Sequence, residues 1–397
     1  MKNISLGFNA QSQKDAFRAG QEAVRMALDL LPGAADFLFL LTTPDYEPLE
    51  TLRGITSVAN MPLIGCPAEQ IIATTGIHST EMAAVMAFQL RHAQLFVEQG
   101  NNGGREKAAV IGRRFAEQVA ESLLAQGHTA VEPLLLLLID SRLEAHVMTE
   151  SIANTLGPLV SVIGGVLNGV CSSAGPFMNA EPRGAAIVGA LLYPYAPIGT
   201  GVAHGWQPSG HAAVATHTNG NVILEINGRP AFKVYQDIWR EMFPDISGKS
   251  EDEFQRAFRA FAIYSPIGLA QIDEEYLLRS PVYIKDGAII CAGGVPENAV
   301  LHFMRGEANM LGKAAEMAMQ QALSRIQQRQ PEAVLLIDCV TRFTRPDYTL
   351  QNELAHIQRL IGTDVPLLGF PSWGEIMNPP QRMIEYHNKA LVVSAFS

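Results

Sequence analysis

Long hydrophobic runs are absent from this sequence. The longest apolar stretches, such as residues 134–139, have the length of one strand, whereas a membrane-spanning helix needs about 20 apolar residues. Residues 1–5 contain one lysine and no apolar core, so they do not resemble a secretory signal. The sequence therefore predicts a soluble protein of the cytoplasm with no membrane association.

Cysteine and charge are also scarce. The four cysteines form no CxxC pair, which argues against a disulfide framework and against a structural zinc site; they are Cys66, Cys171, Cys291 and Cys339. Charged residues make up 17% of the chain and hydrophobic ones 48%, a balance that excludes disorder. The 29 basic and 39 acidic residues give a net charge of −10 without a Lys or Arg run, so we expect no nucleic-acid partner.

Several catalytic motifs are missing as well. The sequence contains no GxSxG nucleophile elbow and no GxGxxG dinucleotide fingerprint. The closest approach to a phosphate-binding loop, from Gly306 to Lys313, is one residue too long and is followed by Ala314 in place of Ser or Thr. These absences argue against a serine hydrolase and against a nucleotide-binding enzyme of the common types.

What the chain does contain is a threefold internal repeat. Each unit reads as an amphipathic helix, an apolar strand, a second helix, a short strand that ends on a glycine, and a closing strand. The first strands are expected at residues 37–41, 134–139 and 334–337, the glycine strands at 62–65, 160–164 and 366–369, and the closing strands at 83–88, 186–191 and 391–396. Repetition of this kind indicates one α/β unit used three times, with a site where the three glycine turns meet.

The pattern changes at about residues 200–300. Asn219-Gly220 lies between two β-branched runs and predicts a hairpin, and a helix is expected from Ala231 to Phe243. The expected fold is therefore α/β, with mixed sheets flanked by helices, three related α-β-α-β-β units and a β-rich insert. We divide the chain into residues 1–199, with two units, and residues 200–397, with the insert and the third unit.

Seven short segments, in order, resemble the FIST family of sensory proteins, which have an N-terminal and a C-terminal FIST domain. The segments are PLIGC at 62–66, VIGG at 162–165, GWQPSG at 205–210, GNVILEINGRPA at 220–231, CVTR at 339–342 with Glu353, GFPSWGEI at 369–376, and His387-Asn388. The resemblance covers essentially the whole chain. It implies a non-enzymatic, cytoplasmic, ligand-binding protein, with amino acids among the ligands proposed for the family.

One subset of bacterial FIST proteins binds haem, senses nitric oxide and regulates a histidine kinase. The resemblance therefore implies haem as a possible cofactor and a signalling partner, such as a histidine kinase or a cyclic-dinucleotide enzyme. Haem iron needs one axial histidine and an apolar slot, so spacing does not identify the ligand. The axial candidates are His217, His211 and His204; no other metal is expected.

The ligand site is expected at the carboxyl ends of the repeated strands, where open α/β sheets bind ligands. The candidate residues are Cys66, Gly65, Gly164, Gly165, Cys339, Arg342, Gly369, Trp373, Glu375 and Asn388. Arg342 directly follows a buried strand and suits either a ligand carboxylate or a structural pair with Glu353 or Glu375.

Three alternatives stay open at this point. The chain is an enzyme with Cys339 as nucleophile, His387 as base and Glu375 as the group that orients the base; or it senses amino acids without haem; or it is a protein-interaction scaffold. Cys339 is also a plausible core residue, because free cysteine is among the most buried residue types.

Overall fold

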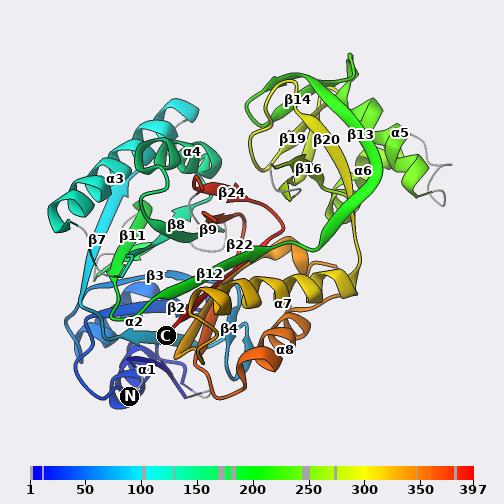
Figure 1. The fold of residues 1–397 in the computed structure, drawn as a ribbon. Helices are drawn as coiled ribbons and strands as arrows, with labels where there is room; N and C mark the ends of the chain where they lie inside the picture. The colour runs from blue at the N-terminus through cyan, green and yellow to red at the C-terminus, as the bar shows by residue number, and fades with distance from the viewer. Residues whose placement is uncertain are drawn as a thin grey trace.

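The computed structural model confirms a mixed α/β fold (Figure 1). The structure describes residues 3–10, 13–100, 104–127, 129, 131–168, 175–179, 185–243, 251–271, 275–345, 347–379 and 382–397. Cys171 lies outside these residues. No helix in the described part of the chain is long and apolar enough to cross a membrane.

The threefold repeat is confirmed, and each unit begins with an additional strand ahead of its first helix. Unit 1 comprises β1 (Ile4–Phe8), α1 (Ala16–Asp29), β2 (Phe37–Thr42), α2 (Pro48–Thr56), β3 (Leu63–Pro67), β4 (Ile71–Ala73), β5 (Gly76–His78) and β6 (Ala83–Phe88). Unit 2 comprises β7 (His92–Gln99), α3 (Arg105–Gln126), β8 (Leu134–Asp140), α4 (Ala145–Leu156), β9 (Ser161–Leu167), β10 (Phe177–Met178) and β11 (Ala185–Tyr193). Unit 3 comprises β12 (Ile198–Ala203), α7 (Ala308–Arg325), β21 (Ala333–Cys339), the 3₁₀ turn η2 (Val340–Arg342), α8 (Leu350–Ile361), β22 (Leu367–Ser372), β23 (Glu375–Met377), β24 (Glu385–His387) and β25 (Leu391–Phe396).

The insert interrupts unit 3 directly after its leading strand. It comprises β13 (Trp206–Asn219), β14 (Val222–Ile226), β15 (Arg229–Pro230), α5 (Ala231–Met242), α6 (Glu251–Tyr264), β16 (Ile267–Ala270), β17 (Tyr276–Arg279), β18 (Pro281–Lys285), β19 (Ala288–Cys291) and β20 (Val300–Gly306). These strands form a separate sheet in the order β17-β16-β20-β13-β14-β19-β18. The predicted hairpin is confirmed, with Gly220 at a φ of 63° between β13 and β14, a conformation that glycine adopts without strain.

The prediction that glycines form turns at the ends of three strands is wrong. Gly65, Gly164 and Gly369 lie within β3, β9 and β22, and none of them has a positive φ. Each is paired in parallel with a leucine of the unit's first strand, and the pairs are Leu40–Gly65, Leu137–Gly164 and Leu336–Gly369.

Close strand packing explains why glycine recurs at this position. A Cβ on Gly65 would lie 2.2 Å from the main-chain oxygen of Leu40, and one on Gly369 would lie 2.6 Å from the Cβ of Leu336. The repeated glycine therefore permits the approach of two parallel strands rather than a change of chain direction.

The three units exchange strands in a closed cycle. β10 of unit 2 pairs with β3 of unit 1, β23 of unit 3 pairs with β9 of unit 2, and β4 of unit 1 pairs with β22 of unit 3. β24 extends β23, and β5 extends β4. Strands from residues 1–199 therefore pair with strands from residues 200–397, and strands from the second part pair with strands from the first. The division of the chain at residue 199 stays a prediction.

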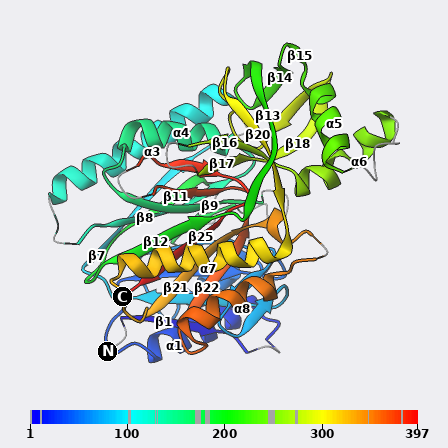
Figure 2. The same cartoon turned by 45° about the vertical axis from the view of Figure 1, so that its right-hand side comes forward.

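The inner faces of the three sheets share one hydrophobic core. It contains apolar side chains from β2, β3, β8, β9, β21 and β22, and the rings of Phe39 and Phe370 lie 6.4 Å apart within it. The helices cover the outer faces: α1 and α2 the sheet of unit 1, α3 and α4 that of unit 2, and α7 and α8 that of unit 3 (Figure 2).

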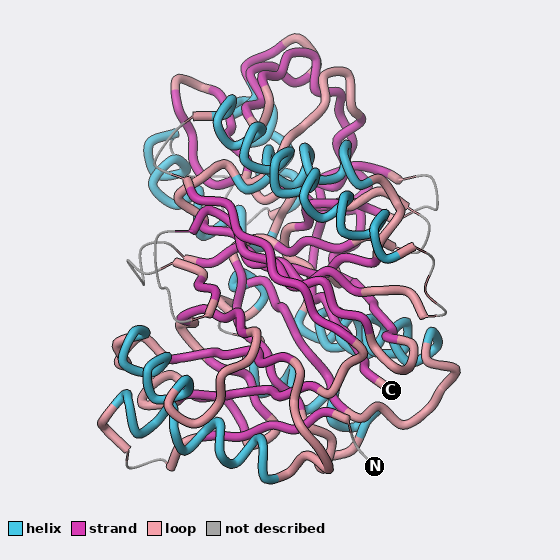
Figure 3. The backbone as a smooth tube through the Cα atoms, turned by 90° about the vertical axis from the view of Figure 1, so that its left-hand side faces the viewer, coloured by secondary structure: helices cyan, strands magenta, loops and turns pink. Residues whose placement is uncertain are grey.

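The insert has its own core, built largely from aromatic side chains of α5 and α6, such as Tyr235, Trp239 and Phe254. It lies beside α4 and above α7, whereas both chain ends lie at the opposite side of the molecule (Figure 3). This arrangement brings the insert, unit 2 and the end of unit 3 together.

Candidate functional site

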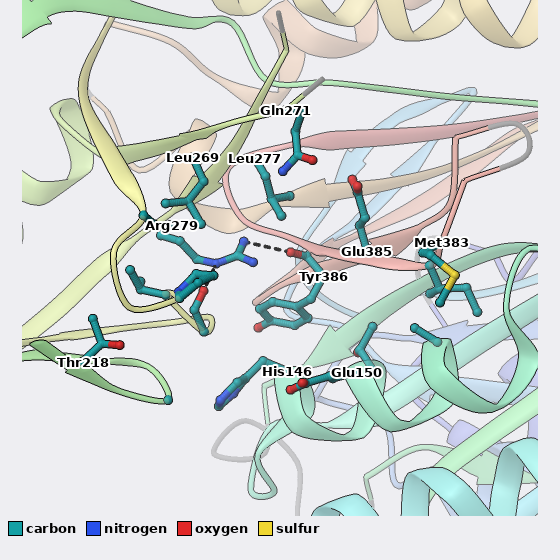
Figure 4. A pocket seen from close by; sticks show the side chains of 18 of the residues that line it. His146, Glu150, Thr218, Leu269, Gln271, Leu277, Arg279, Met383, Glu385 and Tyr386 are labelled. Carbon is teal, nitrogen blue, oxygen red and sulfur yellow. Dashed lines mark hydrogen bonds between the residues drawn. The ribbon is translucent and has the colours of Figure 1, made fainter. Parts of the chain in front are cut away.

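A cavity of about 920 Å³ lies where these three parts meet. One wall is α4, the second is the segment that leads into β24, and the third is the β16–β17 region of the insert with residues 294–300. His146 and Glu150 project from α4 on one side, and Arg279 lies opposite with Tyr386 between them (Figure 4). Pockets of this size at a junction between structural parts are common small-molecule sites.

Arg279, the last residue of β17, is the most unusual side chain in this pocket. It is 8% exposed, and its donors are directed at main-chain oxygens: Nε donates to Gly294 at 2.6 Å, and Nη1 donates to Leu278 at 2.9 Å and Tyr386 at 3.1 Å. No carboxylate among the described residues forms an ion pair with Arg279. Burial lowers the pKa of the guanidinium, because desolvation disfavours the charged form.

His146 faces the same cavity from the first turn of α4. Its ring packs against that of Tyr386 with a centroid separation of 6.3 Å. Burial, together with the nearby charges of Arg105 and Arg279, lowers the pKa of His146 to about 4. Nε2 is buried and makes no hydrogen bond to a described residue. His146 is therefore a neutral imidazole with an unused ring nitrogen at neutral pH.

Acidic side chains also line the pocket, but two of the three already have partners. Glu385 lies 3.5 Å from Nη2 of Arg382, and Glu297 accepts a hydrogen bond from the main-chain nitrogen of Thr218 at 3.2 Å. Glu150 is exposed at the rim. The pocket therefore offers groups of both charge signs to a ligand.

The candidate glycines and Cys66 lie in the protein core, away from this cavity. A Cβ on Gly165 would lie 2.9 Å from both Ile337 and Phe370. Cys66 is fully buried in β3, and burial raises the pKa of its thiol. The candidate glycines and Cys66 therefore serve the packing of the strands, and the core around them has no room for a ligand.

The carboxyl ends of the three glycine strands do converge, as the repeat predicts. Pro67, Leu167 and Pro371 line one crevice together with Trp373, which is 49% exposed. The crevice has a volume of only about 10 Å³, which is room for about one water molecule. The ends of the three strands therefore meet as predicted, but the 920 Å³ cavity is formed by other residues.

Arg342 pairs with Glu353, which is one of the partners that the sequence suggests. Both side chains are buried, with Nη2 of Arg342 2.5 Å from Oε1 of Glu353 and Nε 3.0 Å from Asp338. Nη1 and Nη2 of Arg342 also donate to the main-chain oxygens of His204 and Leu311. The guanidinium is thus enclosed by protein groups, and it lines none of the cavities described here.

Cys339 and Glu375 lie in a second buried polar cluster. Glu375 accepts hydrogen bonds from Ser372 Oγ at 2.5 Å and from the main-chain nitrogen of Ala390 at 3.2 Å, and burial raises its pKa to about 8. Burial and the proximity of Glu375 raise the pKa of Cys339 to about 12. A catalytic thiol needs a lowered pKa and access to substrate, so this geometry does not favour the Cys339 enzyme.

His387 and Asn388 join the insert to unit 3. Asn388 Oδ1 accepts from the main-chain nitrogen of Ser280 at 3.3 Å, and its Nδ2 donates to the main-chain oxygen of His387. Burial, with the charge of Arg279, lowers the pKa of His387 to about 3. Asn388 therefore links the insert to unit 3 beside the pocket and does not line the pocket itself.

The three haem candidates lie in three different environments. In His204, Nε2 lies 3.1 Å from the main-chain oxygen of Tyr276, and Nδ1 accepts from the main-chain nitrogen of Trp206. His211 contacts Ser209 and Glu241 through its two ring nitrogens and lines a mainly polar cavity of about 440 Å³. His217 is exposed on β13. None combines a free ring nitrogen with an apolar slot, so these residues do not fit a haem as they stand.

Arg279 and His146 were not among the predicted site residues. A signal for Arg279 was present: it directly follows the apolar residues Leu277 and Leu278, the same pattern that singled out Arg342. His146 carries no comparable signal, because the two residues that it faces across the pocket, Arg279 and Tyr386, lie more than 100 residues away along the chain.

Fold and pocket together define an α/β protein with a candidate ligand site between an interlocked three-unit body and an inserted β-domain. Residues 36–229 match the FIST N domain and residues 231–378 match the FIST C domain, so the chain belongs to the FIST family. FIST domains are sensory domains that bind small ligands in signalling proteins.

Two mycobacterial proteins are similar along almost their whole length. The uncharacterized protein Rv0628c of Mycobacterium tuberculosis is 25% identical over 388 residues, which is 94% of each chain. The uncharacterized protein Mb0898c of Mycobacterium bovis is 26% identical over 398 residues, again 94% of each chain.

Proposed function

We propose that this chain is a bacterial cytoplasmic sensor that binds a small polar molecule in the 920 Å³ pocket. The observation that carries the proposal is the origin of the pocket walls, which come from unit 2, unit 3 and the insert. A molecule that contacts all three walls stabilises one arrangement of the insert on the body over others, and a ligand shifts an equilibrium by that difference in affinity.

The junction beside the pocket can couple ligand binding to the arrangement of the insert on the body. Arg279, Ser280 and Ile263 of the insert are hydrogen-bonded to Tyr386, Asn388 and Lys389 of unit 3, respectively. A ligand that binds Arg279 is expected to change the strength of these three hydrogen bonds. The signal then passes to a partner protein, and a histidine kinase or a cyclic-dinucleotide enzyme stays the predicted partner. The autophosphorylation rate of a histidine kinase from the same organism, measured with and without this chain, tests the first of these predictions.

Thermal denaturation with a compound panel tests the pocket itself. The panel contains small carboxylates, amino acids, their amides, amines, nucleotides and haem. At least one compound is expected to raise the melting temperature, because a ligand that binds only the folded state stabilises it. No shift with any compound would contradict the proposal.

A matched pair of variants assigns any shift to this pocket. Ala270 is an exposed residue of the insert sheet that lines the cavity, and Ala212 is an exposed residue of the same sheet that does not. Ala270→Trp is expected to abolish the shift and Ala212→Trp to preserve it. Equal binding by both variants would place the ligand elsewhere.

Haem stays a prediction that rests on the family resemblance. The absorption spectrum after haem addition, with and without nitric oxide, checks it independently of the pocket. A Soret band that Ala270→Trp leaves unchanged would separate a haem site from the site proposed here.

A further inference from the structure

We propose that the pocket ligand carries a carboxylate, and that one of its oxygens accepts hydrogen bonds from Nη2 of Arg279. This inference rests on the proposed function, since it names the chemical class of molecule that the same pocket binds.

The first argument is the hydrogen bonding of Arg279. A guanidinium has five N–H groups, and three of them have acceptors in Gly294, Leu278 and Tyr386. The two N–H groups of Nη2 donate to no described residue. The guanidinium lies at the cavity wall next to Tyr386 (Figure 4), so an acceptor for Nη2 has to come from the cavity.

The second argument is charge. Arg279 is 8% exposed and has no ion-pair partner among the described residues. A buried charge is costly unless it is paired and hydrogen-bonded. Glu385, the carboxylate of unit 3 that lines the pocket, acts on the charge of Arg279 through space but forms no hydrogen bond with it, and lies within ion-pair distance of Arg382. A carboxylate on the ligand would give Arg279 the direct ion pair that no described carboxylate forms with it.

The third argument is the polarity around His146. Its pKa is depressed by Arg105 as well as by Arg279, so both guanidinium groups act on the same corner of the pocket. Nε2 of His146 is buried without a hydrogen bond to the described residues. An anion in this corner has two favourable charges nearby and a second polar group within the same cavity.

The donor arrangement favours a carboxylate over a phosphate. Nη2 is a single nitrogen, which matches one oxygen of a monoanion, and charge-assisted bonds of this kind are about twice as strong as neutral ones. A dianion would also meet the carboxylates of Glu150, Glu297 and Glu385 in the same cavity. Glu150, at the exposed rim, suits a hydrogen-bond donor at the other end of the molecule.

The test compares each carboxylate with its own amide by calorimetric titration of the full-length protein. The pairs are lactate and lactamide, propionate and propionamide, succinate and succinamide, and glycine and glycinamide, with inorganic phosphate as a separate arm. At least one carboxylate is expected to bind about 10- to 100-fold more tightly than its amide, which is the range for a hydrogen bond to a charged group. Equal binding of acid and amide, or tighter binding of phosphate, would overturn the inference.

Variants then locate the effect. Arg279→Gln is expected to bind the carboxylate about 10- to 100-fold more weakly, whereas Arg305→Gln, an exposed arginine on β20 of the insert, is expected to bind it normally. Arg279 also donates to three main-chain oxygens, so circular dichroism of the variant checks that its fold is kept. The comparison of acid with amide on the unmodified chain does not depend on this variant.

The outcomes separate this inference from the proposed function. Binding of neutral or cationic compounds alone, abolished by Ala270→Trp, would overturn the carboxylate and leave the pocket. No binding by any carboxylate at millimolar concentration would also overturn it. No binding by any compound of the wider panel would remove the proposed function as well.

Discussion

Nη1 of Arg279 and the main-chain oxygen of Tyr386 lie 3.1 Å apart, although the two residues are separated by 107 positions in the chain. This bond joins the insert to β24, a strand that unit 3 contributes to the sheet of unit 2. Lys389 continues the junction, with Nζ 3.0 Å from the main-chain oxygen of Ile263. The candidate pocket and the junction between the parts of the molecule therefore share a residue.

The buried Arg342–Glu353 pair is expected to be essential for stability. Arg342→Met leaves the buried Glu353 carboxylate without its partner, and loss of one member of a buried pair costs about 3–5 kcal/mol. Arg53→Ala removes an exposed pair with Glu50 and is expected to cost less than about 1 kcal/mol. Urea denaturation measures both, and similar losses in the two variants would contradict the structural role of Arg342.

Alanine at the repeated glycine is expected to destabilise the body. In Gly369→Ala the new Cβ lies 2.6 Å from the Cβ and the main-chain oxygen of Leu336, and overpacking of this kind costs about 1–3 kcal/mol. Gly104→Ala is the control, because nothing lies within 4 Å of a Cβ there and φ is −57°. Equal melting temperatures for the two variants would show that the strands do not need the glycine.

Glu375 is expected to make stability fall with rising pH. Its pKa is about 8 in the folded protein against 4.5 for the free side chain, so between these values the folded state retains a proton that the unfolded chain has lost. The free energy of unfolding therefore decreases as the pH rises through this window. Glu375→Gln, which cannot ionise, should flatten that decrease.

The comparison between wild type and Glu375→Gln is needed because buried neutral histidines act in the opposite direction. His387 has a folded pKa of about 3, so its contribution to stability is lost as the pH falls below the unfolded value of about 6.5. Denaturant titrations from pH 5 to pH 8 measure the two proteins side by side. Parallel curves would contradict the raised pKa of Glu375.

Cys339 is expected to be inert in the folded protein. The residue is 3% exposed, and the pKa of its thiol is raised to about 12, so almost no thiolate forms at neutral pH. Iodoacetamide followed by peptide mass spectrometry should label Cys339 only after denaturation. Rapid labelling of Cys339 in the native protein would instead support the alternative hypothesis that the chain is an enzyme with a cysteine nucleophile.

The local elements could be predicted from the sequence because each has a local cause. Apolar runs predicted the central strands, and Asn219-Gly220 predicted the hairpin. The arginine after a buried strand predicted a carboxylate partner for Arg342 and left Glu353, Glu375 and a ligand as the candidates, of which the structure shows Glu353. The glycines were misread because a glycine within a strand and one at its end look alike until the pairing partner is known.

The strand exchange and the pocket could not be predicted in the same way. Hydrophobic periodicity shows which face of a strand is buried, but it does not show which sheet a short hairpin joins. β4, β10 and β23 each pair with a different unit's glycine strand. The pocket depends on the same long-range arrangement, since His146, Arg279 and Tyr386 meet only after the units have interlocked and the insert has docked.

Amide hydrogen exchange with and without the best-binding carboxylate of the titration series tests the central claim most directly. The account predicts slower exchange in residues 145–154, 276–279 and 385–388, because these segments form the three walls of the pocket and the junction beside it. Protection confined to residues 207–211 and 305–310, around the second cavity, or the absence of any change, would contradict it.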